Sequence, residues 1–392
     1  MGYIDVFSKY YAFSKSPKDN KYYELKKANY DRAVDAFRNN ETEFGCKPFR
    51  ATLQTTDFCN LNCIMCQIHS QRDKHRLQKM SRQQFDIIAE KLFPYLVEVH
   101  PTNIGEPLMS EWFDYLCDKA VEYGVLLDIT SNGTLLNERN IRKILPNLLD
   151  IKISFDGIQK STFERIRKNA DFDAVKRNLD LLLDLRSRYG SNGSVTLQMT
   201  MFDFNYNELP DIIKFAKSRG VDRVKGYHVH SYSSEIDKYS PFNNLADFEQ
   251  IRRLSIQLAE DLDIALELSE PPNSTSKPTG LVPQKCRLPW GECFIDSDGE
   301  VYSCHTHGHH SMGNIYHRQV SEIWDGEYAL FLRKSLIDSS IHSNCSNCGM
   351  NYMKIDENQP VPYNLSGFMH DAEPSSGEIR WSSRNKQFLL NR

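Results

Sequence analysis

From about residue 49 to residue 230 the chain alternates short apolar runs with longer amphipathic ones, and the alternation repeats six times. The apolar runs have the length of strands, and the amphipathic runs place apolar residues at helical spacing. Repeated strand-helix units predict a parallel sheet with helices outside. Six strands are fewer than the eight of a closed barrel, so the sequence predicts an α/β fold with a partial (β/α)6 TIM-like barrel. The expected strands cover residues 50–55, 98–103, 126–130, 151–155, 195–201 and 223–228.

Composition divides the rest of the chain. The first residues are rich in Tyr and Lys and contain one expected helix. Residues 269–280 are rich in Pro, Ser and Gly, which is typical of a linker. We therefore expect an N-terminal helical extension, a barrel core, a helix with a linker, a small cysteine-rich Fe–S unit and a C-terminal tail. Their expected bounds are 1–48, 49–240, 241–281, 282–353 and 354–392.

Charge and hydropathy exclude several classes of protein. The 392 residues include 48 Lys and Arg and 52 Asp and Glu, for a net charge of −4. That balance gives no support for a nucleic-acid or anionic-membrane partner. No apolar run has the length of a transmembrane helix, and the first residues lack the apolar core of a signal peptide. Ten cysteines without a secretion signal favour metal binding or catalysis over disulfides, and they predict a reducing, cytoplasmic setting.

Three of the cysteines lie close together in a polar loop after the first expected strand. Cys59, Cys63 and Cys66 have the spacing C-x3-C-x2-C. Three thiolates on one loop can hold three irons of a 4Fe–4S cluster and leave the fourth iron open to a small chelating molecule. A zinc site is the alternative, but it needs a fourth ligand, and His69 is the only local residue that could supply one.

This spacing after a first strand resembles the radical S-adenosylmethionine (radical SAM) enzymes. The resemblance implies that the open iron takes the amine and carboxylate of S-adenosylmethionine. It also implies reductive cleavage to a 5′-deoxyadenosyl radical, which abstracts a hydrogen atom from the substrate. A flavodoxin- or ferredoxin-type protein is the implied electron donor.

A second set of cysteines lies near the C-terminus. Cys286 and Cys304 flank an expected β-hairpin with an Asp-Gly turn, and Cys345 and Cys348 form a later C-x2-C pair. A hairpin brings its two ends together, so four thiolates in two pairs can fill a second cluster or a structural zinc site. The run Cys286-Arg287-Leu288-Pro289-Trp290 resembles the SPASM domain in its shortened twitch form. That resemblance implies one auxiliary 4Fe–4S cluster.

Polar residues also follow the second and third expected strands. Gly105-Glu106-Pro107 matches the family's Gly-Glu-Pro, although Ile104 stands where many members have a second Gly. A Gly there lets the backbone approach a ligand, and Glu106 can accept a hydrogen bond from the methionine amine. Ser131 and Asn132 follow the third strand and are further candidate cofactor contacts.

The fourth strand adds two more candidates. Ser154 ends this strand, and Arg167 follows thirteen residues later. Carried over from SPASM-type enzymes, Ser154 contacts the ribose or the carboxylate, and Arg167 pairs with the methionine carboxylate. Tyr227, His228 and His230 end the sixth strand, where barrel enzymes place ligand contacts.

One further cysteine has two interpretations. Cys293 lies on the expected hairpin. If it faces the cleft, its thiol is a candidate hydrogen donor to a substrate radical, as the resemblance to epimerases of the superfamily implies. The other interpretation is a buried thiol with no chemical role.

The resemblance predicts a radical SAM oxidoreductase. A fully ligated auxiliary cluster relays an electron, which favours two-electron oxidation of a sugar or cyclitol alcohol by a dehydrogenase. The alternatives are a sugar epimerase and an enzyme that crosslinks, epimerises or oxidises a peptide. Peptide modifiers often have a leader-binding domain, and the first 48 residues are short for one, so a partner would supply it. A non-catalytic Fe–S or zinc redox sensor is the remaining alternative.

Overall fold

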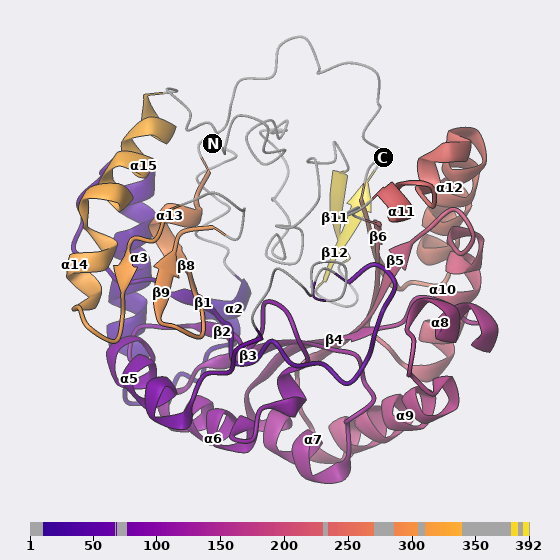
Figure 1. Ribbon diagram of the computed structural model, residues 1–392, viewed down its shortest axis with the longest axis horizontal. Coiled ribbons are helices and arrows are strands. Elements are labelled where there is room, and N and C mark those ends of the chain that lie inside the picture. Colours follow the sequence, from indigo (N-terminus) through magenta and orange to yellow (C-terminus); the bar gives the residue numbers. More distant parts are fainter. Residues whose placement is uncertain are drawn as a thin grey trace.

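The computed structural model describes residues 11–66, 68, 77–229, 234–269, 286–304, 310–338, 378–382 and 387–391. Its main element is a ten-stranded sheet with the order β10-β9-β8-β1-β2-β3-β4-β5-β6-β7 (Figure 1). The strands are β1 (Arg50–Leu53), β2 (Glu98–His100), β3 (Leu126–Ser131), β4 (Leu148–Ser154), β5 (Ser194–Met201), β6 (Arg223–His228), β7 (Ala265–Leu268), β8 (Glu292–Ile295), β9 (Glu300–Tyr302) and β10 (Gly313–Asn314).

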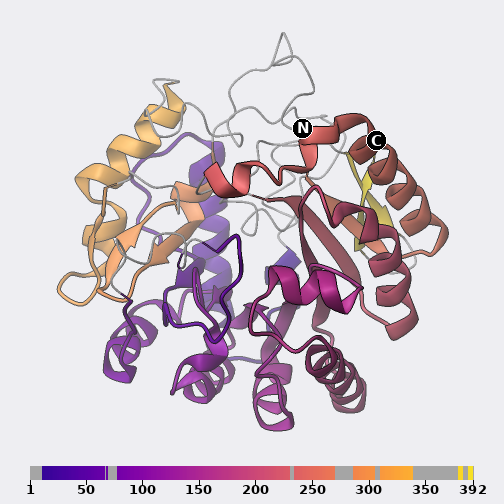
Figure 2. The same ribbon diagram turned by 45° about the vertical axis from the view of Figure 1, so that its right-hand side comes forward.

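Helices cover the outer side of this curved sheet, as two views of the molecule show (Figures 1 and 2). The α-helices are α2 (Tyr11–Lys15), α3 (Tyr23–Arg38), α5 (Arg82–Leu92), α6 (Phe113–Tyr123), α7 (Glu138–Ile144), α8 (Lys160–Ile166), α9 (Phe172–Tyr189), α10 (Leu209–Arg219), α11 (Ser234–Asp237), α12 (Leu245–Asp261), α13 (Leu288–Gly291), α14 (Val320–Trp324) and α15 (Glu327–Ile337). Short 3-10 turns are η1 (Pro107–Met109), η2 (Leu145–Asn147), η3 (Tyr206–Glu208) and η4 (Pro241–Asn244).

The expected fold class is confirmed. Strands β1 to β7 run parallel to their neighbours in chain order. They form an open partial barrel with the helices outside, and each of the six expected strands is present within a few residues of its expected bounds.

Two features of the sheet differ from the expectation. A seventh parallel strand, β7, lies in the segment expected to be only helix and linker. This strand has only four residues, and one of them is the charged Glu267. An apolar pattern this short does not indicate a strand. In addition, β8 of the C-terminal hairpin pairs in parallel with β1, so the C-terminal unit continues the barrel sheet.

Residues 159–189 form one long amphipathic run in the sequence, but the structure divides this run into α8 and α9. Asn169 has φ of +73°, and Asp171 caps α9 by accepting hydrogen bonds from two backbone N–H groups. The break places Arg167 at the end of α8, where its side chain is buried.

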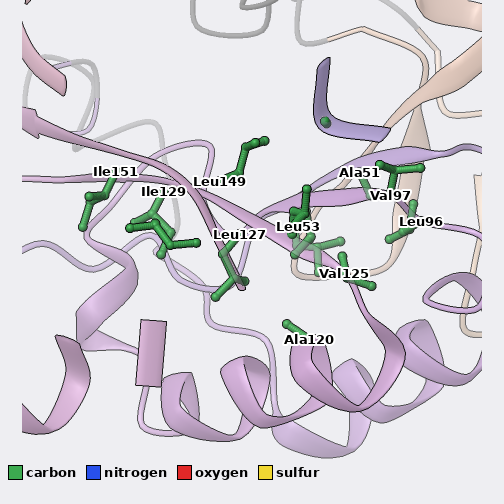
Figure 3. Packing of buried hydrophobic residues seen from close by; sticks show 14 of the residues in the cluster. Ala51, Leu53, Leu96, Val97, Ala120, Val125, Leu127, Ile129, Leu149 and Ile151 are labelled. Atoms are coloured by element: carbon green, nitrogen blue, oxygen red, sulfur yellow. The ribbon is translucent and has the colours of Figure 1, made fainter. Parts of the chain in front are cut away.

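Alternate residues along the strands separate two kinds of packing. One set points to the helices and forms the apolar core, which includes Ala51, Leu53, Leu127, Ile129 and Ile151 (Figure 3). The other set points into the barrel and is charged. Arg50 pairs with Glu98, Asp128 and Glu292, Lys152 pairs with Asp128 and Asp150, and Lys225 pairs with Glu267.

The N-terminal helix α3 packs against α13 of the C-terminal unit. The indole of Trp290 donates a 2.8 Å hydrogen bond to the carbonyl of Glu41, and Arg333 donates one of 2.8 Å to that of Thr42. Among the helices that the structure describes, none combines the length and apolar character needed to cross a bilayer. In the last part of the chain, the backbone of β11 (Glu378–Ser382) and β12 (Gln387–Asn391) forms an antiparallel pair, and β12 lies beside β7.

Candidate cofactor and metal site

The cysteine loop follows β1 and is attached to the end of α8. The backbone N–H of Asn62 donates to the carbonyl of Lys168 at 3.0 Å, and that of Ile64 donates to the carbonyl of Ile166 at 3.0 Å. Within the loop, the N–H of Cys66 donates to the carbonyl of Cys63 at 3.1 Å. The ends of β1 and α8 therefore fix the backbone that carries the three thiols.

Side-chain N–H groups from outside the loop donate to the thiols of Cys59 and Cys63. The side-chain amide of Asn132 lies 3.7 Å from the sulfur of Cys59, and the guanidinium of Arg167 lies 3.8 Å from that of Cys63. Burial raises the pKa of the Cys63 thiol to about 12, and it also raises the pKa of Cys59. A bound metal cation would deprotonate these thiols outright.

In the part of the chain that the structure describes, no three His, Cys, Asp or Glu side chains form a site for one metal ion. Three thiolates on one loop can each bind a different iron of a 4Fe–4S cluster. His69, the fourth ligand considered for zinc, lies outside the described residues.

Gly105 and Glu106 lie against the cysteine loop. Gly105 has φ of +86°, and a Cβ at this position would lie 2.4 Å from the carbonyl oxygen of Thr56, so only Gly fits. The buried carboxylate of Glu106 accepts hydrogen bonds from the hydroxyl of Ser131 at 2.8 Å and the backbone N–H of Asn132 at 2.7 Å. Burial raises the pKa of Glu106 to about 7.

Asn132 connects the end of β3 to the cysteine loop. Its side-chain oxygen accepts hydrogen bonds from the N–H and the hydroxyl of Thr134, at 2.9 Å and 2.6 Å. This fixes the amide nitrogen toward Asn60, at 2.9 Å, and toward Cys59. The structure thus brings together the candidates from the second and third strands.

The candidates from the fourth strand lie on the other side of the loop. Ser154 ends β4, is buried and pairs in register with Gln198. The Nε of Arg167 lies 2.7 Å from a carboxylate oxygen of Asp156, as an ion pair whose angle is outside hydrogen-bond geometry. Burial lowers the pKa of Arg167, but the negative charge of Asp156 outweighs it, so that the pKa is raised.

Asp156 is a residue of this site that the sequence analysis missed. Its backbone carbonyl and its carboxylate are both bonded within the fold, and its side chain is fully buried. The available signal was its position two residues after Ser154, because a residue two positions along an extended chain faces the same side.

Comparison with known proteins agrees with this geometry. Residues 53–216 match the model of the radical SAM superfamily, and residues 286–349 match that of SPASM, an iron-sulfur cluster-binding domain. The chain contains a radical SAM domain and an SPASM domain. These two domains imply S-adenosylmethionine and two 4Fe–4S clusters as cofactors.

Two named relatives match over more than two thirds of the chain. The PqqA peptide cyclase of Bradyrhizobium diazoefficiens is 23% identical over 280 residues, which are 69% of this chain and 69% of that protein. The tungsten-containing aldehyde ferredoxin oxidoreductase cofactor-modifying protein of Pyrococcus furiosus is 22% identical over 326 residues, 76% of this chain and 86% of that protein.

The fold has a counterpart among solved structures. Streptococcus suis SuiB bound to S-adenosylmethionine has a TM-score of 0.59 at 14% identity, and it covers 87% of this chain and 78% of SuiB. SuiB bound to the precursor peptide SuiA has a TM-score of 0.60 at 13% identity, over 87% and 77%. At this identity the likeness concerns the fold.

The SPASM domain contains the hairpin of β8 and β9, which follows α13. Its turn contains Gly299, whose φ is +86°. Cys286 and Cys304 both pack against a small apolar cluster of Leu288 and Phe294. Cys345 and Cys348 lie outside the described residues, so their ligation, like the shortened twitch form of the domain, stays a prediction.

Cys293 lies on β8 and pairs in register with Ala51 of β1. The neighbouring pair, Arg50 and Glu292, points into the barrel, so Cys293 points to the opposite side, where it is buried in the apolar core. This position favours a core residue over a hydrogen donor.

The same alternation separates two candidates at the end of β6. Tyr227 pairs in register with Thr200, on the side of Lys225. His228 lies on the other side, where its ring contacts Ser269 and Phe242. His230 lies outside the described residues.

Proposed function

We propose that this radical SAM enzyme acts on a peptide. The observation that carries this proposal is the extent of the likeness to proteins that act on or bind peptides. A PqqA peptide cyclase matches over 69% of the chain, and SuiB, which has been solved with a precursor peptide, covers 87% of it. These likenesses extend over most of the chain, and they favour the peptide alternative over a sugar or cyclitol alcohol.

We further propose ligands for both clusters. Cys59, Cys63 and Cys66 would hold the first one, because they share one loop at the mouth of the barrel. The second would be held by the other cysteine pairs, Cys286 with Cys304 and Cys345 with Cys348. When bound, the first cluster and S-adenosylmethionine supply the radical that removes a hydrogen atom from the substrate.

Residues of the chain would position the nucleotide cofactor. Gly105 lets the backbone come close to the loop, and Glu106 offers a carboxylate beside it. Ser154 lies on the interior face at the end of β4, where it can donate to a ribose or carboxylate oxygen. A flavodoxin- or ferredoxin-type protein would deliver the electron.

The proposal is tested with anaerobically reconstituted protein. Peptides encoded next to its gene would be incubated with the protein, S-adenosylmethionine and a reductant, and 5′-deoxyadenosine and peptide masses would be measured. We expect one peptide to increase 5′-deoxyadenosine formation and to lose two hydrogen atoms, or to take up deuterium from solvent. The triple Cys59, Cys63 and Cys66 to Ala variant is the control.

Two outcomes would overturn the proposal at different levels. If a sugar alcohol stimulates 5′-deoxyadenosine formation and no peptide does so, the substrate class is wrong and the dehydrogenase or epimerase alternative replaces it. If the reconstituted protein does not bind S-adenosylmethionine at all, the protein is a redox sensor.

A further inference from the structure

Two buried polar side chains reach the cysteine thiols, one from the end of a strand and one from the end of a helix. Asn132 follows β3, and its amide nitrogen lies 3.7 Å from the sulfur of Cys59. Arg167 follows α8, and its Nη1 lies 3.8 Å from the sulfur of Cys63. Both residues are at most 8% exposed. Two separate segments of the fold thus direct N–H donors at two thiols of one loop.

The orientation of Arg167 is fixed by its surroundings. Its Nε is ion-paired with Asp156, and Asp156 is itself held by the backbone N–H of Thr200 at 2.7 Å. The side-chain amide of Asn205 donates to the backbone carbonyl of Asp156 at 2.8 Å. Because the cysteine loop is bonded to the backbone of Ile166, the residue before Arg167, the donor and its acceptor move together.

The orientation of the Asn132 side chain is also fixed by its hydrogen bonds. Its side-chain oxygen is occupied by the N–H and the hydroxyl of Thr134, and its backbone N–H donates to Glu106. The amide nitrogen can therefore point only toward Asn60 and Cys59. An amide whose oxygen is already bonded does not flip at low cost.

Hydrogen bonds to the ligand sulfurs are among the factors that set the reduction potential of an iron–sulfur cluster. A donor stabilises the reduced state more than the oxidised one, because the reduced state carries more negative charge. Residues that contact ligands in this way also fix the geometry of the ligands.

We propose that Asn132 and Arg167 are positioning residues that raise the reduction potential of the first cluster through Cys59 and Cys63, and that Asp156 holds Arg167 in this role. This inference rests on the proposed function, in which these cysteines bind that cluster. It gives Arg167 a contact different from the methionine carboxylate that the sequence analysis expects.

Redox titration of the full-length reconstituted protein tests the inference, with cluster signals followed by electron paramagnetic resonance and no S-adenosylmethionine present. The triple Cys59, Cys63 and Cys66 to Ala variant identifies the signal of the auxiliary cluster. Asn132→Leu removes one donor. The double variant Arg167→Gln with Asp156→Asn removes the other as a complete ion pair, so the net charge stays the same and no charge stays buried alone.

We expect each variant to shift the reduction equilibrium of the first cluster by about tenfold, which lowers its midpoint potential by about 59 mV for one electron. The auxiliary cluster keeps its potential. Arg165→Gln is the matched control, because Arg165 lies on the same helix, is exposed and stacks on Phe204 at 3.7 Å. It should leave both potentials unchanged.

The possible results separate the inference from the proposed function. If the double variant binds S-adenosylmethionine more weakly but keeps the wild-type potential, Arg167 is a carboxylate ligand and the inference is wrong. If Asn132→Leu also keeps the potential, no part of the inference survives. If the wild type forms no cluster at this loop, the proposed function itself fails. Should the double variant take up no cluster, Asn132→Leu decides the result by the same measurement.

Discussion

The two ends of the barrel interior are both polar, but they use their polar groups differently. At the amino ends of the strands, Arg50 lies among Glu98, Asp128 and Glu292, so that acidic and basic side chains neutralise one another. At the carboxyl ends, Asn132 and Arg167 point at cysteine thiols instead. At the amino ends the charged side chains pair with one another, whereas at the carboxyl ends the polar side chains surround cysteines that would bind a cofactor.

This difference shows that one end of the barrel interior serves stability and the other serves cofactor binding. A buried charge must have a partner, or it costs several kcal/mol. Near the amino ends, the partners of Arg50 come from β2, β3 and β8 of the same sheet, and Glu292 of β8 attaches the SPASM domain to the barrel in this way. At the carboxyl ends, the side chains of Asn132 and Arg167 donate to cysteine sulfur, which is a weak acceptor until a thiolate forms. The hydrogen bonds at the carboxyl ends therefore gain strength when cofactors bind, whereas the ion pairs at the amino ends need no cofactor.

Removal of the thiols should have the largest effect. Replacing Cys59, Cys63 and Cys66 with Ala should halve the iron content, from about eight to about four irons per chain, because each cubane contains four. It should also abolish cleavage of S-adenosylmethionine. Iron analysis and detection of 5′-deoxyadenosine measure both. A variant with full iron, or zinc in the second site of the wild type, would contradict the cluster assignment.

The second largest effect should come from breaking the ion pairs of Arg50 at the amino ends of the strands, which should lower the free energy of unfolding. Arg50→Met leaves Glu98, Asp128 and Glu292 without their shared partner, and breaking a buried ion pair costs about 3–5 kcal/mol. Urea unfolding measures this loss. The matched control is Arg142→Met, since Arg142 pairs with Glu138 on the exposed surface of α7, where an ion pair contributes little. Equal effects of the two substitutions would show that the interior network does not stabilise the fold.

A smaller effect is expected in the pH dependence of the free energy of unfolding, through the buried Lys225. Burial lowers the pKa of Lys225 from 10.5 to about 8. Between these values the unfolded chain binds a proton that the folded chain does not, so stability rises with pH from about 8 to about 10.5. The rise is about 3 kcal/mol at most. Lys225→Met should lack this part of the slope in urea unfolding at several pH values, and parallel curves for the two proteins would contradict the assignment.

Cys293 should give the smallest effect, because it belongs to neither end. Cys293→Ala should keep cofactor cleavage and product formation, with a loss of stability of about 1 kcal/mol from the buried core. Turnover with the true substrate measures this. A variant that cleaves the cofactor but stalls before product, together with one carbon-bound deuterium in wild-type product made in deuterated water, would identify an epimerase with Cys293 as hydrogen donor.

Much of the fold could be predicted because its signals are local. Six strands and most helices follow from periodicity within short windows, as in α10, which ends at Gly220. Strand β7 was missed because four residues that include a Glu carry little pattern, and the ion-pair partners of Glu267, Lys225 and Arg223, lie on another strand. The helix break before α9 was missed because Asn169 and Asp171 act within a run that is otherwise helical.

The sequence by itself determined the cysteine spacing, the order of the polar strand ends and therefore the resemblance to radical SAM enzymes. Only the tertiary structure decided what those residues contact. Arg167 meets Cys63 across 104 residues, Asn132 meets Cys59 across 73, and Arg50 meets Glu292 across 242. Such contacts have no local signature, because they arise when non-neighbouring segments pack on one sheet and each buried polar group takes the partner that lies nearest.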